Sequence, residues 1–170
     1  MKNAAWFVLL LCLAGGALGG CSSADDKRAA HEPREHTWSR QQAVGAYRAA
    51  MQPVTRELEA LAAMPTSARL EQTRAALRTF ARASEKAAGT LRAGSWDVDL
   101  RTHVDGLVAA LTDQAEFLDE LAAKPDLAAV RAAAEQSGRT LLLTRTSAAA
   151  VEKDLGIGDR LLDLAASGTS

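Results

Sequence analysis

The chain has 170 residues, of which 48% are hydrophobic and only 4% are aromatic. Its 20 basic and 21 acidic residues give a formal net charge of −1, and this near-neutral balance argues against non-specific nucleic-acid binding. Both cysteines, Cys12 and Cys21, lie near the amino terminus, so no cysteine pair remains for a disulfide in the rest of the chain. Stability must therefore come from an apolar core, for which about 130 residues suffice.

The first twenty residues have the pattern of a bacterial export signal. Lys2 supplies a positive charge, and residues 4–17 (AAWFVLLLCLAGGA) form a continuous apolar stretch. This stretch is shorter than the ~20 residues of a membrane-spanning helix, and it is followed by Leu18-Gly19-Gly20-Cys21, with small residues before the cysteine. We therefore expect residues 1–20 to be a signal peptide that is cleaved before Cys21.

Leu18-Gly19-Gly20-Cys21 resembles the lipobox of bacterial lipoproteins, in which a small residue precedes an obligatory cysteine. The resemblance implies that the thiol of Cys21 carries a diacylglyceryl group and that the new amino terminus is acylated, for example with palmitate. Two or more acyl chains, at about 0.8 kcal/mol per buried methylene, hold a protein on a bilayer. The alternative is an ordinary signal peptide in which Cys21 is an incidental thiol.

Residues 21–37 are predicted to be the lipidated cysteine and a flexible tether. Residues 22–37 (SSADDKRAAHEPREHT) are rich in charge and almost free of large apolar side chains. As a random coil this segment would span about 20 to 25 Å. His31 and His36 could suggest a metal site, but two histidines on a flexible chain do not fix ligand geometry, and we favour a solvated linker.

From Trp38 onward, apolar residues recur at alternating intervals of three and four, which indicates helices that pack together. The first two helices are expected at 38–63 and 67–92, with Thr66 or Ser67 as the N-cap of the second. A third helix follows a cap at Ser95 and ends at the turn Lys124-Pro125-Asp126. The fourth begins at Leu127 and is expected to end at Gly156.

Four helices of about 25 residues with short connections predict an all-α fold, an antiparallel up-and-down four-helix bundle over residues 38–156. Pro53 lies within the first helix, where we expect it to cause a kink because the apolar phase continues across it. Residues 157–170 are expected to form a short helix and a polar tail.

Charge is unevenly distributed along these helices. The second has six basic and two acidic residues, whereas residues 95–124 have two basic and seven acidic residues. Four cations of the second helix are spaced four apart and define a basic stripe: Arg74, Arg78, Arg82 and Lys86. The stripe could contact anionic headgroups, an acidic envelope polymer or a protein. For the stripe taken alone we favour the alternative, a solvated face that pairs loosely with the acidic third helix, because exposed ion pairs are common and individually weak.

Two groups of residues in the third helix have side chains that could serve as metal ligands. An acidic row, Asp113, Glu116 and Glu120, has helical spacing but needs ligands from another helix. Asp99 and His103 are one turn apart, so that the carboxylate could orient the imidazole. The chain lacks the Glu-x-x-His pairs of di-metal bundles, and we predict neither a metal site nor a cofactor.

Catalytic motifs are also missing from the sequence. It contains no Gly-x-Ser-x-Gly turn, Gly-rich phosphate loop or Cys-His pair, so we expect no enzymatic activity. Ala134, Ser137, Thr144 and Ala148 make the apolar face of the fourth helix small and slightly polar. Such residues allow either close helix packing or a narrow cavity for a small apolar ligand.

The lipobox, the polar tether, the Ala- and Arg-rich helices and the closing residues 149–157 (AAVEKDLGI) resemble small helical lipoproteins of high-GC Gram-positive bacteria. The resemblance implies attachment to the outer face of the cell membrane through Cys21, or to the outer membrane if the source is Gram-negative. We expect a membrane-anchored helical module that binds a protein or another envelope component. Carriage of a small apolar ligand is the alternative.

Overall fold

The computed structural model describes residues 37–136 and 138–157, and the described part of the chain is all-helical, without a strand. This confirms the all-α prediction. The helices are α1 (Arg40–Ala62), α2 (Leu70–Arg92), α3 (Val98–Ala122), α4 (Leu127–Gln136) and α5 (Gly138–Leu155). The predicted signal peptide, Cys21, the tether up to residue 36 and the terminal helix after residue 157 lie outside the described residues.

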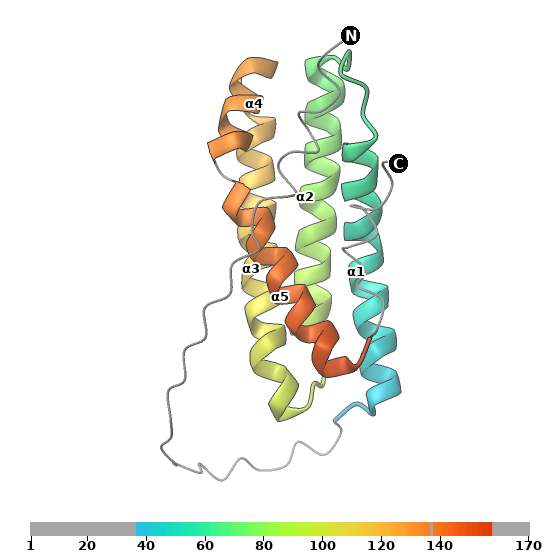
Figure 1. The fold of residues 1–170 in the computed structure, drawn as a ribbon. Helices are drawn as coiled ribbons and strands as arrows, with labels where there is room; N and C mark the ends of the chain where they lie inside the picture. The colour runs from blue at the N-terminus through green and yellow to red at the C-terminus, as the bar shows by residue number, and fades with distance from the viewer. Residues whose placement is uncertain (1–36, 137, 158–170) are drawn as a thin grey trace.

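Helix α2 packs against both α1 and α3, and its contact with α3 is the most extensive among the described helices. α1, α2 and α3 stand side by side, while α5 runs obliquely across α3 towards the beginning of α1 (Figure 1). α4 rests against the far end of α3. The core therefore lies between α1, α2, α3 and α5, and the upper end of α3 is covered by α4.

The prediction of one continuous fourth helix is wrong, because residues 127–155 form two helices, α4 and α5. The apolar spacing is continuous across this segment, but Gly138 is a poor helix former and offers little resistance to a break. A break also lets α4 lie along α3 while α5 crosses α3 to reach α1.

The starts of α2 and α3 differ from the predicted ones. α2 begins three residues after Ser67, so neither Thr66 nor Ser67 caps it. The N-cap of α3 is Asp97 rather than Ser95, and its carboxylate accepts a hydrogen bond of 3.2 Å from the Asp99 backbone N–H. An N-cap carboxylate is favoured because it satisfies a free N–H and opposes the positive end of the helix dipole.

Ser95 has a different role, in a corner that joins the start of α1 to the α2–α3 connection. The Trp38 N–H donates to the Ser95 carbonyl oxygen at 2.8 Å, and the Trp38 ring meets the buried Trp96 ring edge-on, with centroids 4.9 Å apart. Trp96 Nε1 donates to the Leu91 carbonyl oxygen at 2.5 Å. Gly94 is buried beside both rings, where a Cβ would overlap them.

The apolar positions of the predicted helices supply the core. α1 continues across Pro53 and buries Tyr47, Met51 and Val54. The largest fully buried aliphatic and aromatic side chains of the other helices are Phe80 and Leu91 of α2, Val104, Leu107, Leu111 and Leu118 of α3, and Val151 of α5. α5 ends where Gly156 takes a positive φ of 65°, as predicted from that glycine.

Candidate functional site

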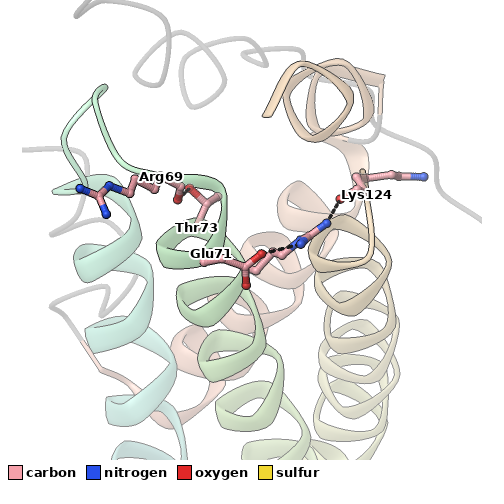
Figure 2. Close-up of polar contacts among 5 residues, drawn as sticks. Arg69, Glu71, Thr73 and Lys124 are labelled. Atoms are coloured by element: carbon pink, nitrogen blue, oxygen red, sulfur yellow. Dashed lines mark hydrogen bonds and ion pairs between the residues drawn. The ribbon is translucent and has the colours of Figure 1, made fainter. Parts of the chain in front are cut away.

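The first member of the basic stripe is bound within the fold. Arg74 donates from Nη1 to Glu71 Oε1 at 2.6 Å and from Nη2 to the Lys124 carbonyl oxygen at 2.7 Å (Figure 2). Lys124 follows the last turn of α3, where free carbonyls and the negative end of the helix dipole favour a cation. Arg74 Nε is buried and makes no hydrogen bond with the described residues. Arg74 therefore fastens α2 to the end of α3.

The other three members of the stripe, Arg78, Arg82 and Lys86, are exposed on α2. Arg82 Nη2 donates to the Thr79 hydroxyl at 3.3 Å within the same helix. None of the three forms an ion pair with a residue that the structure describes. The expected loose pairing with α3 is thus not made at contact distance, and the three cations face solvent.

The acidic row of α3 is also exposed, on the helix that packs against α2. Asp113, Glu116 and Glu120 form no ion pair within the described part of the chain. Across residues 37–136 and 138–157, no three His, Cys, Asp or Glu side chains are grouped closely enough to hold a metal ion. The row is therefore an exposed anionic strip on α3, the helix that packs against the one carrying the basic stripe.

His103 interacts with a different residue from the one considered on sequence grounds. Its Nδ1 lies against Asp154 Oδ2 of α5, whereas Asp99 donates its backbone N–H to the Asp97 carboxylate at the start of α3. The two side chains are partly exposed, His103 to 48% and Asp154 to 34%. The contact links the beginning of α3 to the end of α5, as a surface ion pair when the imidazole is protonated.

Arg40 completes this end of the molecule, and sequence reasoning did not single it out. Its Nε donates to the Leu155 carbonyl oxygen at 3.1 Å and its Nη2 to the Asp154 carbonyl oxygen at 3.4 Å. The first residue of α1 thereby caps the last turn of α5 with a positive charge. Nothing local in the sequence indicates a contact between residues more than a hundred positions apart.

Tyr47 and Glu152 form the most deeply buried pair of ionisable groups among the described residues. The Tyr47 hydroxyl lies 2.9 Å from Glu152 Oε1, and the two residues are 0% and 2% exposed. Burial, followed by the negative charge of Glu152, raises the pKa of Tyr47 above its ordinary value of 10.0. Substrate cannot reach either group, so the pair joins α1 to α5 rather than forming a catalytic site. The sequence does carry a sign that Glu152 is buried, because Glu152 lies one helical turn after Ala148 on the apolar face of the same helix.

The small, slightly polar face of the fourth predicted helix lies against α3. Thr144 is buried, and its hydroxyl contacts the Ala110 carbonyl oxygen at 3.1 Å and the Thr140 carbonyl oxygen at 3.3 Å. Ala148 is also buried, whereas Ser137 lies outside the described residues. A side chain that reaches the backbone of the next helix indicates close packing at this point rather than space for a ligand.

No known protein family matches this chain, and no characterised protein or solved structure shows significant similarity to it. Within the described residues, no helix combines the length and the apolar character that crossing a membrane requires.

Proposed function

We propose that this chain is a lipoprotein that is anchored through Cys21 on the extracytoplasmic side of a membrane, and that its helical domain is a non-enzymatic binding module for an anionic partner. The exposed members of the basic stripe form the binding surface in this proposal. In this proposal the scaffold is an up-and-down four-helix bundle. α4 and α5 together take the place of its fourth helix, and α1 is kinked near Pro53.

One observation carries the proposed binding role. Arg78, Arg82 and Lys86 extend over more than two turns of α2, exposed and without an acidic partner among the described residues. Arg74, by contrast, is bound to Glu71 and to the end of α3. Three positive charges on one face of a helix attract an anionic surface, and their exposed side chains can adjust their positions around it.

Pull-down from solubilised membranes tests the binding surface. Arg78→Glu combined with Arg82→Glu should remove the captured partner, because attraction at two positions becomes repulsion. The matched control is Arg48→Glu with Arg56→Glu, which makes the same charge change at two exposed arginines of α1. Capture that is equal in both double variants would refute the basic stripe as the binding surface.

Fractionation of cells tests the anchor separately. Cys21→Ala removes the thiol that would carry lipid, and the protein should move from the membrane fraction to the soluble fraction or remain unprocessed. The same chain with Cys12→Ala is the control, because Cys12 lies inside the proposed signal peptide. Membrane association that survives Cys21→Ala would refute lipid attachment.

Carriage of a small apolar ligand remains the alternative proposal. It would require open space beside the small residues of α5, where Thr144 is in contact with the backbone of α3. Native mass spectrometry of gently purified protein would favour the carrier if a ligand mass were retained. We prefer the binding module because the exposed cations need no rearrangement to meet a partner.

A further inference from the structure

The neighbouring helices α2 and α3 carry opposite charges that do not form ion pairs with each other. Arg78, Arg82 and Lys86 are exposed on α2, and the acidic row is exposed on α3. The six residues form no ion pair with the described residues of their own chain. A partner that matches both surfaces must carry an anionic strip beside a cationic one.

Two contacts fix how α2 and α3 are aligned along their length. Arg74 reaches the Lys124 carbonyl oxygen, and Ser84 accepts a hydrogen bond from Gln114 Nε2 at 2.8 Å. The ten residues from Arg74 to Ser84 on α2 thus cover the same length as the ten residues from Lys124 back to Gln114 on α3. This is expected for antiparallel helices with equal rise per residue.

This alignment places the two charged strips at the same levels. Arg78 is level with Glu120 and Arg82 with Glu116, and Lys86 is level with Asp113 to within one residue, a displacement of about 1.5 Å. Each of the three exposed cations of the basic stripe therefore has a residue of the acidic row at its own height on α3.

A two-fold axis parallel to the helices converts this side-by-side arrangement into complementary pairs. Rotation by 180° about such an axis keeps each residue at its level and exchanges the two helices, so that α2 of one copy faces α3 of the other. Arg82 of the first copy then faces Glu116 of the second copy, and Glu116 of the first copy faces Arg82 of the second. A perpendicular axis in the plane of this face would instead place α2 on α2, with like charges opposed.

The parallel axis is also compatible with attachment to a membrane. It leaves the first residue of α1 at the same end in both copies, so the two proposed tethers start from the same end of the dimer. Exposed ion pairs are individually weak, and confinement to one membrane raises the effective concentration of the copies.

We propose that the basic stripe binds the acidic row of a second copy of this chain, in a two-fold dimer whose axis runs parallel to α2 and α3. This inference rests on the proposed function, because it names the anionic partner of the same surface and relies on the proposed anchor to concentrate the two copies.

Zero-length cross-linking of the full chain in its membranes tests the dimer. A carbodiimide joins a lysine amine to a carboxylate in direct contact, and here it should join Lys86 of one copy to Asp113 of the other. We expect a cross-linked dimer whose linked peptide is identified by mass spectrometry. The dimer should be lost at about 1 M salt, where the Debye length is near 3 Å.

Charge reversal tests the predicted symmetry. Arg82→Glu and Glu116→Arg should each reduce the cross-linked dimer by about tenfold or more, because each places like charges together twice in a symmetric pair. Co-expression of the two variants should restore it, since both opposing positions then carry opposite charges. Arg48→Glu on α1 is the control and should leave the yield unchanged.

Several outcomes would overturn the dimer. They are the absence of a dimer in the wild-type chain, a yield that neither reversal changes, no recovery on co-expression, and cross-links from Lys86 to another protein only. If pull-down still depends on Arg78 and Arg82 in such a case, the dimer is wrong and the binding surface stands. If capture is also independent of these residues, the proposed function fails as well.

Discussion

Ser84 and Gln114 form a buried polar contact in the middle of the α2–α3 interface. They are 0% and 2% exposed, and Gln114 Nε2 donates to Ser84 Oγ at 2.8 Å, while the serine hydroxyl donates to the Phe80 carbonyl oxygen at 3.0 Å. Ser84→Ala removes the acceptor and leaves a buried amide N–H without its partner. An unsatisfied buried donor costs about 1 to 3 kcal/mol. We therefore expect Ser84→Ala to lower the free energy of unfolding by about this amount.

Thermal and urea unfolding followed by far-ultraviolet circular dichroism measure this change. For a helical domain of this size the loss corresponds to a fall in Tm of roughly 4 to 12 °C. The matched control is Thr90→Ala, because Thr90 is exposed and its hydroxyl donates to the Lys86 carbonyl oxygen of the same helix at 2.9 Å. Its effect should stay within about 0.5 kcal/mol.

A double variant separates loss of the hydrogen bond from loss of packing. Gln114→Leu in the Ser84→Ala background removes the donor that was left unpaired, and part of the lost stability should return because replacing both polar partners by apolar groups can be nearly neutral. The reasoning is refuted if Ser84→Ala is no more destabilising than Thr90→Ala, or if Gln114→Leu lowers the stability of Ser84→Ala further.

Two further predictions concern α1 and the glycines. Because the pKa of Tyr47 is raised in the folded state, its contribution to stability is complete below the unfolded value of 10.0 and is lost as pH rises above it. Unfolding free energy should therefore fall less steeply above pH 10 in Tyr47→Phe than in wild type, and parallel curves would contradict the assignment. Gly156→Ala should cost about 1 to 2 kcal/mol, since alanine resists a φ of 65° and its Cβ would meet the Arg40 guanidinium. Gly106→Ala, in a helix and with no neighbour within 4 Å, should instead stabilise by about 0.5 to 1 kcal/mol; equal effects of both substitutions in thermal unfolding would refute the distinction.

The helices could be predicted because each carries its own apolar period and its own stop signal. Helical spacing located α1, α2 and α3 to within a few residues at each end, and Gly156 marked the end of α5. Capping was less predictable. Ser95 and Asp97 are both good N-cap residues, and only the contact of the Ser95 carbonyl with the Trp38 N–H assigns Ser95 to the corner.

The break between α4 and α5 shows where local pattern stops being informative. The apolar spacing of residues 127–155 suits one long helix, and Gly138 lowers the cost of a break without requiring one. The break is settled by packing, because α4 lies on α3 while α5 crosses from α3 towards α1. Helical stability in proteins comes mainly from such tertiary contacts.

By itself, the sequence determined that the described chain is helical, which side of each helix is apolar, and that α2 is basic where α3 is acidic. It could not distinguish Arg74 from Arg78, since both occupy the same stripe at the same spacing. Only the tertiary structure decided that Arg74 meets the carbonyl end of α3 while Arg78 remains exposed. The same holds for Glu152, whose carboxylate is buried against Tyr47 from another helix. Periodicity records which face of a helix is buried, whereas the partner of a charge depends on the alignment of helices distant in sequence.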